Sequence, residues 1–191
     1  MIRYLFVGEM HGTNECPELF LELVKRHRLT QIALEWPMTK QQEVDEYLSG
    51  KRTIAQLSLF ESNPDGRTSP AMQKLLAEAK RRKLRVHLFD PGVIDHRDRL
   101  MAENLKNIKG PVAILCGDIH ASKREVQLPT IVRLVGKLTR NPQWSKTIIP
   151  CASLLPKKEA FSYRIAERTK ELPLEDHYDE HIIIEKFTKS K

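Results

Sequence analysis

Short apolar runs alternate along this chain with longer segments in which apolar residues recur every three or four positions. The short runs have the length of buried β-strands, and the longer segments have the period of helices that pack one face against a core. The predicted strands before residue 120 cover residues 3–8, 31–34, 85–89 and 111–116. The predicted helices between them cover residues 17–27, about 39–48, about 69–83 and 97–108.

Residues that favour helix ends lie at the boundaries of several of these segments. Asn14 and Thr39 are placed to cap the first two predicted helices, and Gly110 follows the end of the fourth. Residues 50–67 are less regular, and their Asn-Pro-Asp-Gly stretch at 63–66 is a strong turn signal. The boundaries therefore support an alternation of strands and helices.

The last third of the chain has a weaker pattern. We predict a helix over residues 129–138, a strand over 147–149, an edge strand over 161–164 and a final strand over 181–184. The lysine-rich end, from about residue 186 to residue 191, is predicted to be a mobile tail.

This alternation predicts an α/β fold. Strands separated by helices favour a mostly parallel central sheet with helices on both of its faces. A length of 191 residues is enough for a sizeable core in one domain, so we predict a single domain over residues 1–191.

Composition and the start of the chain argue against a membrane-spanning or secreted protein. Hydrophobic residues make up 40% of the chain and charged residues 30%, and no apolar stretch approaches the roughly 20 residues needed to cross a bilayer. The start of the chain lacks the pattern of a secretory signal. We therefore expect a cytoplasmic protein that does not act on membranes. The sequence does not define the oligomeric state, for which a homodimer is the candidate.

Charge and cysteine content indicate which partners to expect and whether the cysteines form disulfides. The formal net charge of +7 favours anionic partners, but the basic residues are dispersed, and the dense run at 80–83 closes a predicted helix. No nucleic-acid-binding signature accompanies it, so no specific nucleic-acid partner is expected. Cys16, Cys116 and Cys151 are too scattered for a disulfide framework, and we expect buried, reduced thiols.

Acidic residues and histidines follow each of the first four predicted strands. Two of these segments share the pattern Gly-x-x-His. In chain order, the residues that follow the strands are Glu9, His11, Glu35, Asp90, Asp118 and His120. Because the carboxyl ends of parallel strands meet at one edge of a sheet, we expect a cluster there that forms an active site. Arg97, in the first turn of a predicted helix, opposes the helix dipole, which suggests that it faces an anion.

Such a cluster can activate water. A histidine can take a proton from water while a carboxylate fixes its tautomer, and a guanidinium can stabilise the oxyanion that forms. Alternatively, His11, His120, Glu9 and Glu35 are a plausible ligand set for a divalent ion such as zinc or manganese.

Each residue also has a structural interpretation when it is taken alone. A single histidine is more often structural than catalytic, as we expect for His27 and His87. Residues 90–92 read as a turn, and Arg97 with Asp98 reads as a surface ion pair of little energetic value. The joint placement of the polar residues after four strands favours the active site.

Four ordered motifs resemble those of erythromycin esterase-like proteins and their wider superfamily, which includes the haem-binding ChaN proteins, TraB/PrgY and the Tiki proteases. They are Gly8-Glu9-Met10-His11-Gly12-Thr13-Asn14-Glu15, Ala33-Leu34-Glu35-Trp36-Pro37, the helix segment 97–104 and Gly117-Asp118-Ile119-His120-Ala121. Weaker similarity in the last third extends the match over nearly the whole chain.

The resemblance implies a site of five residues: Glu9, His11, Glu35, Arg97 and His120. In the esterase branch, the residue equivalent to His11 is the general base. In the Tiki branch, the paired motifs imply a metal ion, for which manganese, cobalt and zinc are candidates. In the haem-binding branch, a similar scaffold binds porphyrin.

We therefore predict a hydrolase that acts on an ester or amide bond of a small molecule. The chain is far shorter than the erythromycin esterases, so macrolides are not the expected substrate. The alternative is a ChaN-type protein that binds haem or another small molecule without catalysis, although no tyrosine in the motifs offers an axial haem ligand.

Overall fold

The computed structural model describes residues 2–61, 66–93, 95–134, 137–167 and 177–190. Within these residues, six strands form one sheet in which every neighbouring pair is parallel. From one edge to the other, the order is β3 (Arg85–Asp90), β2 (Gln31–Pro37), β4 (Val112–Gly117), β1 (Tyr4–Glu9), β7 (Ala160–Glu167) and β8 (Glu180–Ile184). The parallel α/β fold predicted from the alternating pattern is thereby confirmed.

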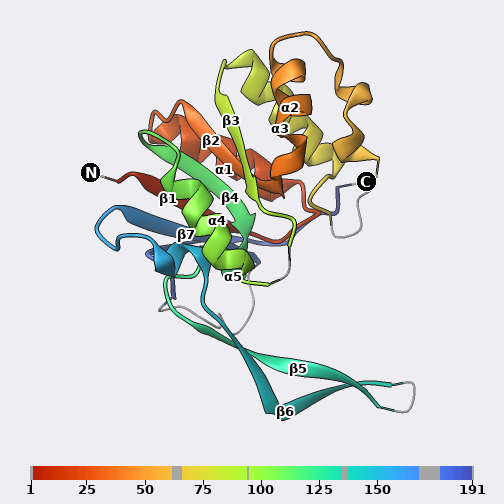
Figure 1. Cartoon of the computed structure of the whole chain (residues 1–191), viewed down its shortest axis with the longest axis vertical. Helices are drawn as coiled ribbons and strands as arrows, with labels where there is room; N and C mark the ends of the chain where they lie inside the picture. Colours follow the sequence, from red (N-terminus) through yellow and green to blue (C-terminus); the bar gives the residue numbers. More distant parts are fainter. Residues whose placement is uncertain (1, 62–65, 94, 135–136, 168–176, 191) are drawn as a thin grey trace.

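Helices cover both faces of the sheet (Figure 1). α1 (Glu15–Arg26), α2 (Gln41–Leu48) and α3 (Pro70–Arg81) pack on one face, and α4 (Arg97–Lys106) and α5 (Asp118–Ala121) pack on the other. Short 3₁₀ helices cover Met38–Lys40, Ile54–Gln56, Ser58–Phe60 and Cys151–Leu154. None of the helices in the described ranges is long and apolar enough to cross a membrane.

The side chains of β1 alternate between two cores because successive residues of a strand point to opposite faces. Leu5 and Val7 join the core under α1, α2 and α3, whereas Tyr4 and Phe6 join the core under α4 and α5. Every residue of β1 is buried, as expected for a strand near the middle of a parallel sheet.

Two helix starts differ from the predictions. Asn14 is the N-cap residue of α1, but its side chain donates to Thr188 Oγ1 and to the carbonyl of Lys189 instead of accepting from the helix. The cap predicted at Thr39 is wrong, because this residue lies inside a 3₁₀ turn and α2 begins two residues later. Ser69, in contrast, accepts a hydrogen bond from the amide of Met72 as the cap of α3.

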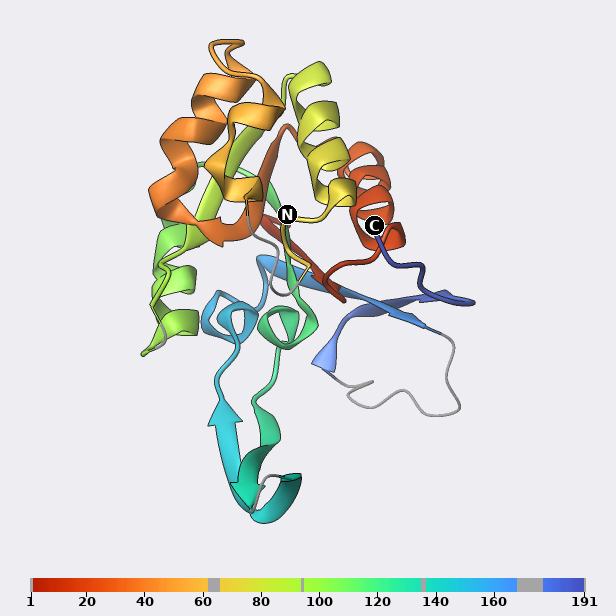
Figure 2. The ribbon, with the colours of Figure 1, turned by 90° about the vertical axis from the view of Figure 1, so that its right-hand side faces the viewer.

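The helix predicted over residues 129–138 is wrong. The chain instead forms two antiparallel strands, β5 (Val126–Leu134) and β6 (Lys137–Ile148), that project from the body of the molecule (Figures 1 and 2). The apolar spacing fits a helix, but Pro129 and the β-branched residues at 130–132 favour an extended chain. The strand predicted at 147–149 is the end of β6.

The end of the chain differs from the predictions in two ways. The edge strand predicted at 161–164 is the interior strand β7, because β8 pairs with its outer side. The segment predicted to be a mobile tail, near residues 186–191, contacts the rest of the chain within its described residues, because Lys189 forms a β-bridge with Thr13.

Candidate functional site

Glu35, at the carboxyl end of β2, is the centre of a cluster of polar side chains, and only 3% of its side chain is exposed. Its Oε1 accepts hydrogen bonds from Arg97 Nη2 at 2.7 Å and Arg67 Nη1 at 3.0 Å. Its Oε2 accepts from the backbone amide of Gly117 at 2.7 Å. The buried carboxylate is therefore compensated by two cations and one amide, as a buried charge requires.

His11 forms a pair with Glu9 on one side of Glu35. The imidazole Nδ1 donates to Glu9 Oε1 at 2.9 Å, and Nε2 faces Glu35 Oε2 at 4.0 Å. Glu9 thus fixes the proton on Nδ1 and leaves the lone pair of Nε2 directed into the cluster. The 4.0 Å between His11 Nε2 and Glu35 Oε2 is too long for a direct hydrogen bond.

His120 forms a second pair with Asp98 on the other side. Its Nδ1 donates to Asp98 Oδ1 at 2.7 Å, and the same oxygen accepts from the amide of Cys151 at 2.8 Å. The Nε2 of His120 lies 3.6 Å from Glu35 Oε1 and accepts from Arg97 Nη1 at 3.4 Å. Two histidines from strands far apart in the sequence therefore meet at one carboxylate.

Arg97 joins β3 to this cluster. Its Nε and Nη2 donate to Asp90 Oδ1 at 3.1 Å and Oδ2 at 2.6 Å. Asp90 also accepts from the amide of Gly92 at 2.9 Å and from Arg67 Nη1 at 3.4 Å. The arginine at the start of α4 faces anions, as its unfavourable position in the helix dipole suggested.

The two Gly-x-x-His glycines serve different purposes. A Cβ at Gly8 would lie 2.9 Å from the Cα of Asp118, so this glycine lets α5 pack closely on β1. A Cβ at Gly117 would lie 3.2 Å from His11 Nε2 and 3.6 Å from both Glu35 Oε2 and His120 Cδ2. The missing side chain of Gly117 therefore leaves space between the two imidazoles.

The carboxylates control the protonation of both histidines. Burial disfavours the charged imidazole of His11, but the hydrogen bond that His11 donates to Glu9 and the charges of Glu9 and Glu35 outweigh burial and raise the pKa of His11. At His120, burial again disfavours the charged imidazole, but the hydrogen bond to Asp98 and the charges of Glu35 and Asp98 outweigh it and raise the pKa of His120. At Asp90, burial is opposed by Arg97 and the Gly92 amide, which hold the pKa of the carboxyl below its ordinary value.

All five residues proposed from the sequence lie in or beside this cluster, together with Asp90, which was expected there as a strand-end carboxylate, and the structure adds Arg67 and Asp98. Arg67 precedes α3 in a stretch without periodicity, so no sequence signal identified it. The surface ion pair considered for Arg97 and Asp98 is wrong, because Asp98 bonds His120. The turn expected at residues 90–92 carries a site carboxylate as well.

Other polar residues considered in the sequence lie outside the cluster. Asp118 contacts Arg164 at 3.3 Å, His27 contacts the hydroxyl of Tyr163 at 3.3 Å, and His87 contacts Gln31 at 3.2 Å. The three cysteines are buried free thiols, as expected.

The residues suggested as metal ligands bind protein groups in this arrangement. Two arginines and an amide occupy the oxygens of Glu35, and Arg97 Nη1 donates to Nε2 of His120. Across the residues that the structure describes, no group of three or more His, Cys, Asp or Glu side chains is arranged to hold a metal ion. This arrangement of the described side chains does not fit a metal ion.

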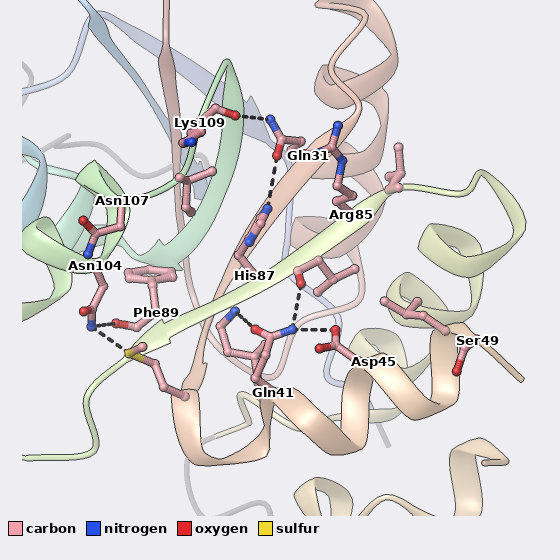
Figure 3. A pocket seen from close by; sticks show the side chains of 16 residues that line it. Gln31, Gln41, Asp45, Ser49, Arg85, His87, Phe89, Asn104, Asn107 and Lys109 are labelled. Carbon is pink, nitrogen blue, oxygen red and sulfur yellow. Dashed lines mark hydrogen bonds between the residues drawn. The ribbon is translucent and has the colours of Figure 1, made fainter. Parts of the chain in front are cut away.

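A cavity of about 700 Å³ lies apart from this cluster, along the outer edge of β3. Figure 3 shows Gln41 lying across that edge, where its carboxamide donates to the carbonyl of Val86 at 2.9 Å and accepts from the amide of Leu88 at 2.7 Å. The carboxamide occupies the position that a neighbouring strand would take and so closes the edge.

Comparisons with known proteins show the fold. No family model matches the sequence, and no curated protein matches it significantly. Among solved structures, the chain is similar to ChaN of Campylobacter jejuni, described with cofacially bound haem, at 12% identity and a TM-score of 0.57 over 91% of this chain and 84% of that chain. It is also similar to the type III effector HopBA1, at 16% identity and a TM-score of 0.52 over 88% and 78%. At these identities, the similarity shows a ChaN-like fold and nothing about activity.

Proposed function

We propose that this chain is a hydrolase of the erythromycin esterase-like superfamily that cleaves an ester or amide bond in a small molecule. The observation that carries the proposal is the convergence of two carboxylate-bound imidazoles on the buried, arginine-bound Glu35. The four sequence motifs and the ChaN-like fold support the assignment to the superfamily.

His11 is the proposed general base. Its Nδ1 proton is held by Glu9, so Nε2 can accept a proton. The space over Gly117, between this nitrogen and Glu35, is where we place the attacking water. Glu35 orients the water, and Glu9 stabilises the imidazolium that forms when Nε2 takes its proton.

Arg97 and His120 are the proposed oxyanion stabilisers. The hydroxide attacks the carbonyl carbon, and the carbonyl π electrons move to the oxygen. Arg97 Nη1 donates to that oxygen directly. His120 Nε2, 3.4 Å from Arg97 Nη1, donates to it only in the protonated imidazolium form, which Asp98 and Glu35 favour by raising the pKa of His120. When the tetrahedral intermediate collapses, the bond to the leaving group breaks and the imidazolium of His11 returns the proton to the leaving oxygen or nitrogen.

The test is a panel of p-nitrophenyl esters and aminoacyl p-nitroanilides, assayed with and without a chelator. For a substrate that is turned over, we expect His11→Ala to lower kcat/KM by about 10²–10⁴-fold, the usual contribution of a general base. His87→Ala is the matched control, because His87 lies outside the cluster. Full turnover by His11→Ala would exclude the proposed role.

Elemental analysis of the purified protein tests the metal alternative. A stoichiometric divalent ion, together with loss of activity in chelator, would assign His11, His120, Glu9 and Glu35 to a metal site and replace the mechanism above.

The second candidate function is binding of haem or another small molecule without catalysis. The similarity to ChaN, whose structure is described with bound haem, favours haem as the ligand. Titration with haemin separates the two functions: a Soret shift that is lost in His120→Ala and kept in His87→Ala supports binding. Absence of any shift excludes haem.

A further inference from the structure

The last described residues of the chain lie against the loop that carries His11. Lys189 forms an antiparallel bridge with Thr13, the amide of Ser190 donates to the carbonyl of Gly12 at 2.8 Å, and the amide of Asn14 donates to the carbonyl of Thr188 at 3.0 Å. Three consecutive residues after His11 are thus paired with residues 188–190, which we call the clasp.

The clasp also contacts the segment that carries Arg67. Ser190 Oγ accepts from the amide of Ala71, in the first turn of α3, at 2.8 Å. Gly66 packs so closely on the His11 loop that a Cβ there would lie 2.5 Å from the Cα of Gly12. Ser190 therefore bonds both to the loop that carries His11 and to the first turn of α3, which directly follows the loop that carries Arg67.

Among the residues that the structure describes, neither loop contains a helix or strand of its own to hold it. Gly12 and Gly66 both have positive φ, and the residues between β1 and α1 form a turn. The side chains that these loops present, His11 and Arg67, approach opposite oxygens of Glu35.

We propose that residues 188–190 are positioning residues that set the place of His11 and Arg67 relative to Glu35. The clasp touches neither the reacting atoms nor Glu35 and acts only through the two loops. Its effect on turnover rests on the proposed hydrolase function, whereas its effect on the His11 imidazole does not.

The test uses the full chain, a chain that ends at Phe187, and Ser190→Ala. Ser49→Ala is the matched control, because that hydroxyl donates to the carbonyl of Glu46 at an exposed helix end far from the clasp. Imidazole ¹⁵N shifts, measured at one pH, report the tautomer and protonation of each histidine. His120, held by Asp98 and Arg97 away from the clasp, is the internal reference.

We expect the His11 signals to shift or broaden in the shortened chain, and to a smaller extent in Ser190→Ala, while those of His120 stay in place. Unchanged His11 signals, or equal shifts at both histidines, would overturn the proposal. If the shortened chain does not fold, Ser190→Ala and Thr188→Val decide by the same criterion.

Activity is a separate readout. On a substrate of the full chain, the shortened chain should lose about tenfold in kcat/KM, because small misplacements of a catalytic group are costly. If no substrate is found, the proposed function fails while the imidazole shifts still decide the role of the clasp.

Discussion

At the scale of single residues, the two histidines of the cluster differ in what occupies their second nitrogen. His120 Nε2 accepts a hydrogen bond from Arg97, whereas His11 Nε2 faces a carboxylate across 4.0 Å. A base needs a free lone pair directed at the proton that it removes. His11 meets this condition in the structure as it stands, and His120 meets it only if Arg97 moves.

Glu9 controls the pH at which His11 can act. Its hydrogen bond and charge raise the pKa of His11, so Glu9→Gln should lower that pKa. The acid limb of the pH profile of kcat/KM should then move to lower pH, because the neutral imidazole forms at lower pH. Histidine-resolved NMR titration measures the same shift directly, and an unchanged limb would contradict Glu9 as the partner of the base.

The two motif glycines offer a matched pair of substitutions. Gly117 has ordinary backbone angles, so Gly117→Ala should fold, but its methyl group would press on His11 Nε2 and fill the space assigned to water. We expect a loss of about ten- to a hundred-fold in kcat/KM with little change in stability.

Gly8→Ala should instead destabilise the fold by about 1–3 kcal/mol, because its Cβ would meet the backbone of Asp118. Denaturant unfolding and turnover are measured on both variants. A large loss of stability in Gly117→Ala, or an unchanged stability in Gly8→Ala, would contradict these assignments.

At the scale of elements, the strands and helices before residue 120 follow directly from the spacing of apolar residues. The helices bury one stripe of residues and the central strands bury both faces. Helices therefore show apolar residues every three or four positions, and strands show short continuous apolar runs. The hairpin at 126–148 breaks the correspondence, because its apolar spacing satisfies a helix while its backbone pairs as strands. The interior position of β7 was not predictable from residues 161–164, since it depends on where β8 docks.

The outer edge of β3 depends on one side chain. Gln41→Ala removes the carboxamide that pairs with Val86 and Leu88, so we expect a loss of about 1 kcal/mol per hydrogen bond and faster hydrogen exchange at the amide of Leu88 (Figure 3). Gln42→Ala is the control, because the carboxamide of Gln42 donates to Glu46 Oε1 on the exposed side of α2. Equal exchange at Leu88 in the two variants would show that Gln41 does not protect the edge.

At the scale of the whole molecule, the sheet collects side chains that are distant in sequence. Four of the predicted site residues lie at or just beyond the carboxyl ends of β1, β2 and β4, whose shared edge was deducible from the parallel fold. Arg67 and Asp98 were not deducible as members of the site, because their roles depend on which carboxylate or imidazole the folded chain places beside them.

The raised pKa values of His11 and His120 link the stability of the whole fold to pH. Protonation of either imidazole favours the folded state, so this stabilisation is complete below about pH 6.5, the pKa of histidine in an unfolded chain, and is lost as pH rises through the folded values. The melting temperature should therefore fall across that window. Replacement of both histidines by glutamine should flatten the profile, and an unchanged slope would contradict the linkage.

The position of β1 in the sheet has a consequence for folding during translation. This first strand lies between β4 and β7, both translated long after it, and the loop that follows it is held by residues 188–190. A nascent chain therefore carries β1 as an unpaired apolar segment until β4 has been translated, and such segments are the kind that chaperones protect. The loop that carries His11 acquires its contacts with residues 188–190 only after those residues have been translated, so a chain truncated before them would lack these contacts.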